Sequence, residues 1–253
     1  MQIDLNSDLG EGFGPWAMGD DGAMLDVVTS ANIACGGHAG DPQTMFATLR
    51  QAVARGVVIG AHPGYPDREG FGRRVIPMQP AEIARMVAAQ VGALQGVAAL
   101  AGARVRYVKP HGALGNLAAD DRAVADAIVA AVAALPGDLA VLAISGTELE
   151  LAARAAGLSV FSEIFADRAY LPDGRLVPRA LPGAVLHDAD EAADRLTRFL
   201  DSGLMPVIGG DPIPLAVHSV CVHGDTAGAV AMARILRARL DAAGVAVAPF
   251  LAG

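Results

Sequence analysis

Short apolar segments alternate along this chain with longer segments whose apolar residues recur at helical spacing. About seven such strand–helix units follow one another, and their strands have the composition of strands that are buried on both faces. Parallel pairing under a layer of helices is the architecture that this order favours. Polar residues follow nearly every strand, whereas an open sheet would concentrate them near its switch point, so we expect an α/β fold with a closed or nearly closed (β/α) barrel.

The expected elements cover the chain without a linker or a shift in composition, so residues 1–253 are predicted to form a single barrel domain. Strands are expected at 3–5, 31–34, 57–59, 105–108, 139–144, 158–164 and 219–222, with a further short strand at 205–208. Helices are expected at 20–28, 41–55, 80–102, 120–135, 147–156, 190–200 and 225–243, and Asp41 and Asp225 are expected to cap two of them.

Composition excludes several classes of function. The 27 acidic residues outnumber the 19 basic ones, and a net charge of −8 argues against a nucleic-acid-binding surface. The chain opens without a basic, apolar leader, and its alanine- and valine-rich stretches are interrupted before the roughly 20 residues that a membrane span needs. Two cysteines in such a chain indicate a reducing compartment, and we expect both to be buried small residues. The sequence therefore predicts a cytoplasmic protein that binds neither nucleic acid nor membrane.

Lys109 is the only lysine in the sequence, because the other 18 basic residues are all arginine. It lies where a short apolar strand ends, in the segment Val-Lys-Pro-His-Gly-Ala-Leu that contains His111. A lysine retained against this strong bias, directly beside a histidine, indicates a chemical role rather than a surface role.

Similar polar segments follow the other strands. Five of the six histidines lie at or beside a strand end, namely His38, His62, His111, His218 and His223. In a parallel barrel such groups are expected to converge on one rim, where substrates bind. Each segment taken alone has a simpler interpretation, since His-Pro-Gly is a common turn. The glycine spacing at 10–14 does not match a dinucleotide fingerprint, and no phosphate-binding P-loop motif contains Lys109.

The sequence resembles the LamB/YcsF family along its whole length. The stretches that carry the resemblance are DLNSDLGEGFG at 4–14, ANIACGGHAGDP at 31–42, GAHPGYP at 60–66, GFGRR at 70–74, VKPHGAL at 108–114, FADRAY at 165–170 and CVHGDT at 221–226. Ser7 and Gly115 depart from residues that are frequent in the family.

The resemblance implies a seven-stranded barrel similar to the glycoside hydrolase/deacetylase superfamily. It also implies the ATP-dependent opening of 5-oxoproline (pyroglutamate) to L-glutamate, carried out as an A subunit together with partner subunits B and C. ATP would be a cosubstrate, because phosphorylation of the amide oxygen removes the resonance that protects an unstrained lactam from water.

Roles for the rim residues follow as hypotheses. We expect Lys109 and Arg168 to stabilise negative charge on the ring oxygen or on phosphate. Asp8, His62 and His111 would either activate water or bind a divalent metal, since one carboxylate and two imidazoles make a plausible open site. Proton transfer or orientation of these groups is expected from Glu163 and His223. Substrate binding is expected from His62, His223, Asn6, His38 and Tyr65.

Two other functions remain open at this point. One is a stand-alone metal-dependent hydrolase or deacetylase that works without ATP. The other is a non-catalytic lactam-binding subunit whose partners perform the chemistry. The concentration of acidic, imidazole and lysine side chains at one rim favours catalysis over binding alone.

Overall fold

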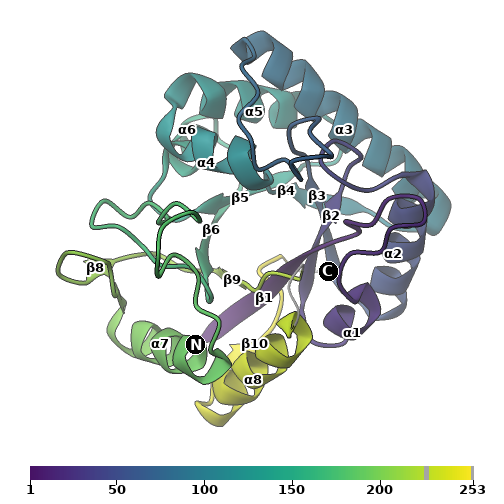
Figure 1. The fold of residues 1–253 in the computed structure, drawn as a ribbon. Coiled ribbons are helices and arrows are strands. Elements are labelled where there is room, and N and C mark those ends of the chain that lie inside the picture. The colour runs from purple at the N-terminus through teal and green to yellow at the C-terminus, as the bar shows by residue number, and fades with distance from the viewer. Residues whose placement is uncertain (225–227, 252–253) are drawn as a thin grey trace.

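The computed structural model describes residues 1–224 and 228–251, and within them seven parallel strands close into a barrel. The first strand pairs with the second on one side and with the last barrel strand on the other, which closes the ring (Figure 1). The predicted seven-stranded (β/α) barrel is therefore confirmed. Its strands are β1 (Gln2–Leu9), β2 (Ser30–Ala34), β3 (Val58–His62), β4 (Val105–Val108), β5 (Ala140–Ile144), β6 (Val160–Phe165) and β9 (Ser219–Cys221).

Helices surround the barrel on the outside (Figure 1). Asp41 caps the second helix as predicted, because its carboxylate accepts the backbone N–H groups of Gln43 and Thr44 at 2.8 and 3.0 Å. The predicted cap at Asp225 lies outside the described residues. The helices are α1 (Asp21–Leu25), α2 (Pro42–Ala54), α3 (Pro80–Ala101), α4 (Gly112–Asp120), α5 (Arg122–Ala134), α6 (Glu148–Ala155), α7 (Ala189–Ser202) and α8 (Ala229–Ala242).

Several elements differ from the sequence-based expectation. A helix, α4, begins directly after His111, and Asp121 separates it from α5 by adopting an extended conformation and capping the second helix. Where a strand was expected at 205–208, only the two-residue strand β7 (Leu204–Met205) forms, because Pro206 has no N–H to donate to a sheet. Strand β7 pairs with β8 (Ile213–Pro214) outside the barrel. A strand that was not expected, β10 (Ala246–Val247), pairs with the start of β1.

Strand β1 is longer than expected because its polar residues point into the barrel. With a period of two residues, Asp4, Asn6 and Asp8 share the inner face, while Leu5 and Leu9 face the helices. Asp4 accepts a hydrogen bond from Ser30 at 2.6 Å, and Asn6 donates one to Ser219 at 2.7 Å. These inward hydrogen bonds satisfy buried polar groups that would otherwise destabilise a strand interior.

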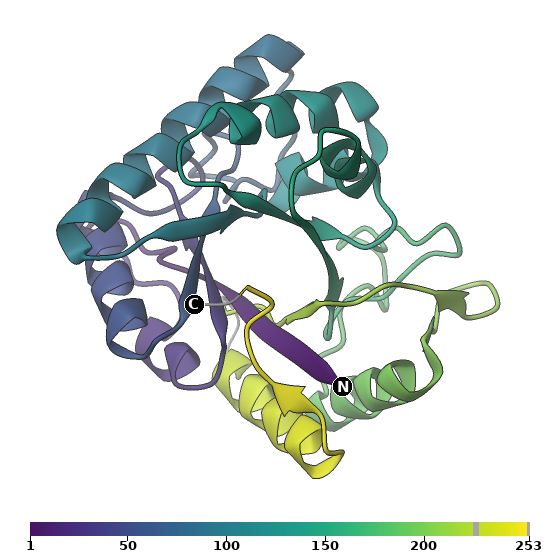
Figure 2. The same cartoon turned by 180° about the vertical axis from the view of Figure 1, so that it is seen from behind.

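Aromatic side chains close the end of the barrel where the strands begin. The ring of Phe250 lies 5.0 Å from Tyr107 and 4.7 Å from Phe161, measured between centroids. Figure 2 shows the C-terminal segment crossing this opening after β10. The polar lumen is therefore covered by apolar groups at this end, and access from outside is through the opposite rim.

Helix α3, with 22 residues, is long and apolar enough to cross a membrane by length and composition, which the sequence interpretation excluded. Its residues Ile83, Val87, Val91 and Leu94 are buried within the same hydrophobic core that holds the barrel strands together. A core helix of this kind satisfies the same criteria as a membrane span, so α3 is weak support for membrane insertion.

Gly60 in β3 provides a sharp test of packing inside the barrel. A Cβ atom added to Gly60 would lie 2.2 Å from the ring of Tyr107, whereas one added to Gly92 in α3 would meet open space. We expect Gly60→Ala to lower the free energy of unfolding by about 1–3 kcal/mol through overpacking. Gly92→Ala should raise it by about 0.5–1 kcal/mol. Urea denaturation of both variants measures this, and equal effects would contradict the packing described.

Candidate active site

A cavity of about 490 Å³ opens at the carboxyl ends of the strands. Its wall includes Asp8 from β1, His62 from β3, Glu163 from β6, and Lys109 and His223, which follow β4 and β9. With His111 and Arg168, which also line it, the cavity brings together seven of the residues that the sequence assigned to the site. This is the end of a parallel barrel where ligands bind.

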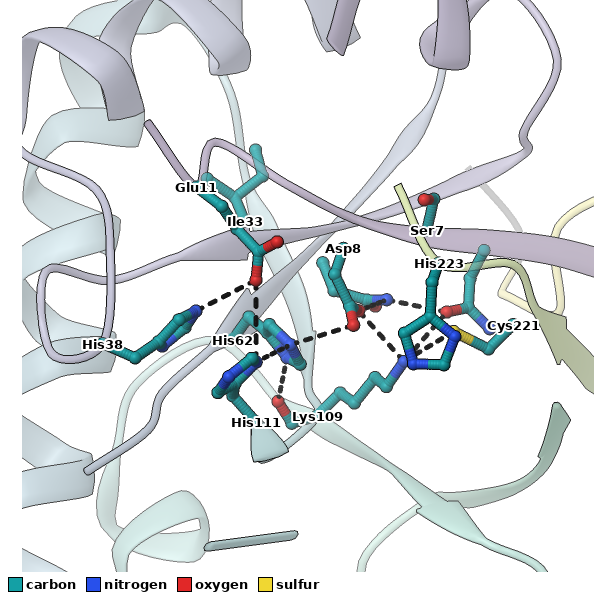
Figure 3. Close-up of polar contacts among 12 residues, drawn as sticks. Ser7, Asp8, Glu11, Ile33, His38, His62, Lys109, His111, Cys221 and His223 are labelled. Atoms are coloured by element: carbon teal, nitrogen blue, oxygen red, sulfur yellow. Dashed lines mark hydrogen bonds and ion pairs between the residues drawn. The ribbon is translucent and has the colours of Figure 1, made fainter. Parts of the chain in front are cut away.

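Lys109 lies at the centre of this group. Its Nζ is 3.0 Å from Asp8 Oδ1 and 2.8 Å from Glu163 Oε1. It also lies 3.2 Å from Asn6 Oδ1. The distance to Cys221 Sγ is likewise 3.2 Å (Figure 3). Only 4% of Lys109 is exposed, so one buried ammonium is held between two carboxylates.

The two carboxylates beside Lys109 differ in electrostatic environment. Burial favours a neutral Asp8, but the nearby His62 and Lys109 outweigh it and hold the pKa of Asp8 well below its usual value. Burial dominates at Glu163 and raises its pKa. Burial also opposes the charge of Lys109, but the adjacent negative charges hold its pKa well above its usual value. Asp8 and Lys109 are therefore ionised, and Glu163 is the more easily protonated carboxyl group.

A second cluster, which we call the Glu–His cluster, adjoins Asp8 and consists of Glu11, His38, His62 and His111. Glu11 Oε1 is 3.1 Å from His38 Nε2 and 3.6 Å from His111 Nδ1 (Figure 3). His62 Nε2 lies 3.0 Å from His111 Nδ1 and 3.3 Å from Asp8 Oδ2. All four residues of the cluster are buried, and one ligand atom from each lies within 4.8 Å of the others.

Backbone carbonyl groups orient two of these imidazoles. His62 Nδ1 is 2.7 Å from the carbonyl oxygen of Lys109, and His111 Nε2 is 2.8 Å from that of Phe71. A carbonyl oxygen only accepts, so each of these nitrogens carries hydrogen. Burial lowers the pKa of His111 to about 3, which leaves its Nδ1 with a free electron pair directed toward His62 Nε2. This contact requires either a proton or a cation between the two nitrogens.

The donor set of the cluster fits a divalent metal ion. Neutral imidazoles and a carboxylate are ligands of zinc and related metals, and hydrogen bonds from the outer ring nitrogens to carbonyl groups are the usual support for such ligands. Burial also lowers the pKa of His38, so this imidazole is neutral as well. The four residues of the Glu–His cluster could hold the metal, and Asp8 adjoins them.

His223 occupies another part of the cavity wall with different partners. Its Nδ1 lies 2.7 Å from Asp167 Oδ2, and its Nε2 lies 2.6 Å from Nη2 of Arg179. Asp167 therefore accepts the Nδ1 hydrogen, and Nε2 faces the guanidinium as an acceptor. The ring stacks on Phe165 with centroids 5.5 Å apart. The carboxylate thus fixes the tautomer and the orientation of the imidazole.

The other predicted residues have different surroundings. Tyr65 is fully buried in the hydrophobic core. Asn6 contacts Lys109 from below, inside the barrel. Arg168 lines the cavity, but its guanidinium donates to the carbonyl groups of Val177 and Ala184 at 2.7 and 3.3 Å. His218 precedes β9, so the expectation that it joins the same rim is wrong. Both cysteines are free and buried, as predicted.

Sequence reasoning missed Glu11 and Asp167. Glu11 follows Asp8 by three residues, and the chain turns between them at Gly10, whose φ of +69° favours glycine. Asp167 follows β6 by two residues. Both are acidic residues just after a strand, the signal that identified the other rim residues, so the same criterion could have found them.

Comparison with known proteins identifies the family. The model of the LamB/YcsF family matches residues 3–252. The chain belongs to the LamB/YcsF family. Among curated relatives in this family, the A subunit of 5-oxoprolinase from Gluconobacter oxydans (strain 621H) is 56% identical over 245 residues, covering 97% of this chain and 96% of the relative. The protein of the same name from Nocardia farcinica (strain IFM 10152) is 56% identical over 251 residues, covering 99% and 100%.

Two solved structures share the fold of this chain. The crystal structure of a lactam utilization protein from Thermus thermophilus superposes with a TM-score of 0.92 at 42% identity, covering 98% of this chain and 99% of that one. A putative cellobiose-phosphate cleavage protein from Enterococcus faecalis V583 has a TM-score of 0.59 at 12% identity over 98% of this chain and 97% of that one, which shows a shared fold.

The Glu–His cluster predicts stoichiometric metal binding. Titration of the purified, chelator-treated chain with Zn²⁺ or Mn²⁺ should give one tight site. Glu11→Gln should weaken it at least about tenfold, because a charged ligand is replaced by a neutral amide. Glu69→Gln is a matched control, since the Glu69 side chain is 94% exposed. Equal affinities for the two variants would show that the cluster does not bind metal.

Lys109 and Glu163 should be energetically coupled. We expect Lys109→Met to lower the free energy of unfolding by about 3–5 kcal/mol, because it leaves buried carboxylates without their cation. Adding Glu163→Gln to Lys109→Met should recover part of that loss, because it removes one of the two buried carboxylates. A double-mutant cycle in urea measures the coupling. Strictly additive costs would mean that the ion pair contributes nothing to the fold.

Proposed function

We propose that this chain is the A subunit of an ATP-dependent 5-oxoprolinase, which hydrolyses 5-oxoproline to L-glutamate together with subunits B and C in the cytoplasm. The observation that carries the proposal is the buried Asp8–Lys109–Glu163 group beside the Glu–His cluster at the base of the cavity. The names of the relatives supply the substrate and the place in a multisubunit enzyme. Free cysteines at 35 and 221 are consistent with a reducing compartment.

Lactam hydrolysis needs stabilisation of negative charge on the ring oxygen, and Lys109 is the group suited to it. A buried ammonium held by Asp8 and Glu163 is fixed before substrate arrives, so little reorganisation is required in the transition state. Asp8 is ionised and reaches the cavity, so it can accept a proton from attacking water. In this proposal Glu163 positions Lys109.

Opening the ring also requires a proton on the departing nitrogen. His223 is suited to relay it: Asp167 accepts its Nδ1 hydrogen, and Nε2, the acceptor that faces Arg179 at the cavity wall, would first take up a proton from water and then pass it to the ring nitrogen. The imidazoles of the Glu–His cluster are less suited to proton transfer, since burial keeps His38 and His111 neutral. A divalent ion held by the cluster would supply Lewis-acid polarisation of a carbonyl or phosphoryl oxygen.

ATP has a clear chemical purpose in this reaction. Amide resonance and the easy re-closure of glutamate both favour the intact five-membered ring, so hydrolysis without activation is unfavourable. Phosphorylation of the ring oxygen would remove the resonance and convert the lactam carbon into a good electrophile. We propose that ATP is a cosubstrate of the assembled enzyme.

The test is glutamate release from 5-oxoproline and ATP by the chain alone and by its mixture with subunits B and C. We expect activity only in the complete mixture. Activity of the chain alone, without ATP, would instead support a stand-alone metal-dependent hydrolase, which the Glu–His cluster favours as the second candidate. No glutamate from either sample would exclude 5-oxoproline as the substrate.

Substitution of His223 separates catalysis from mere lactam binding. His223→Gln in the complete mixture should lower kcat by about 10²–10⁴-fold, the usual range for loss of general acid–base catalysis. His187→Gln is the control, because His187 is exposed in the loop before α7. Unchanged kcat in both variants would support the alternative in which this chain only binds the lactam.

A further inference from the structure

Among the residues that the structure describes, four arginines line the cavity, and one of them, Arg175, is ion-paired with Asp120. The other three are Arg73, Arg168 and Arg179. Arg73 lies in the loop after β3, whereas Arg168 and Arg179 lie in the long segment after β6, and all three line the cavity. They therefore reach the same space from two different sides of the barrel mouth. Arginine presents a planar fork of donors that matches carboxylate and phosphate groups.

The guanidinium groups are close enough to influence one another. Burial and the positive charges of Arg179 and Arg73 lower the pKa of Arg168 to about 10, although the Asp167 carboxylate acts in the opposite direction. Arg168 is held by the carbonyl oxygens of Val177 and Ala184, which are uncharged acceptors. Its charge is thus fixed at the cavity wall. Like charges in a concave site concentrate positive potential and attract an anion.

The arginines also adjoin the proposed reacting groups. Arg179 contacts Nε2 of His223 at 2.6 Å, and His223 stacks on Phe165. Lys109 Nζ lies 5.3 Å from the centroid of the same phenylalanine ring. Phe165 therefore contacts both Lys109 and the imidazole that Arg179 contacts. Lys109 and the three arginines line the same cavity, so a single ligand in it can face both the ammonium and the guanidiniums.

We propose that Arg73, Arg168 and Arg179 form an oxyanion-binding subsite that recognises the acidic group of a small lactam. The identity of the ligand as a lactam rests on the proposed function, whereas the subsite rests on the placement of the three guanidiniums. The oxyanion is either the carboxylate of the lactam or a phosphoryl group on it, since both match the same arginine geometry.

Calorimetric titration of the full chain, without turnover, tests the subsite. The probes are 5-oxoproline, 2-pyrrolidinone (the same ring without the carboxylate) and inorganic phosphate. Arg73→Gln and Arg179→Gln are suitable variants because both residues are exposed and their replacement spares the buried Arg168. Arg104→Gln is the matched control, since Arg104 is exposed and precedes β4 at the opposite end of the barrel.

Carboxylate recognition is supported if both cavity variants bind 5-oxoproline at least about tenfold more weakly than the wild type. Their affinity for 2-pyrrolidinone should then be unchanged. The same loss confined to phosphate supports a phosphoryl group. Wild-type binding of phosphate but not of 5-oxoproline would keep the subsite and reject the proposed substrate. The proposal is overturned if neither anion binds the wild-type chain, or if the cavity variants bind both as the Arg104 variant does.

Discussion

The structure of the site depends on one buried cation between two carboxylates. Without Lys109, Asp8 and Glu163 would face each other in a medium of low dielectric constant, and at least one would have to take up a proton. With Lys109 in place, Asp8 stays ionised and faces both the cavity and His62. The same ammonium also contacts Asn6 and Cys221, so it fixes the positions of these neighbouring side chains.

The barrel interior below Lys109 explains how such a charge is tolerated. A chain of hydrogen bonds runs from Asp4 through Ser219 and Asn6 to Lys109. At its far end burial raises the pKa of Asp4 to about 6. Phe250 packs over this end of the lumen. A polar network that is satisfied and covered by aromatic groups is rigid, so the cation at its upper end is held in a fixed position.

Much of the fold and part of the site could be predicted from the sequence. Strand–helix alternation predicts the closed barrel, and the position of Lys109, His62 and His223 directly after strands predicts their convergence. The direction of side chains within loops is not encoded in that pattern. Tyr65, in a loop after β3, therefore turned out to lie in the core, and Glu11 joined the histidines through a turn that its spacing from Asp8 does not reveal.

The histidines of this cavity have the same intrinsic chemistry but differ in the hydrogen-bond acceptor to which each ring donates. His62 and His111 each donate to a backbone carbonyl, which fixes the tautomer and directs an electron pair inward. His223 donates instead to the Asp167 carboxylate, and its Nε2 faces the Arg179 guanidinium. Neutral acceptors thus favour imidazoles that bind a cation, and a charged acceptor favours one that exchanges protons. The backbone carbonyls of Lys109 and Phe71 therefore contribute to the chemistry of the site as directly as its charged side chains do.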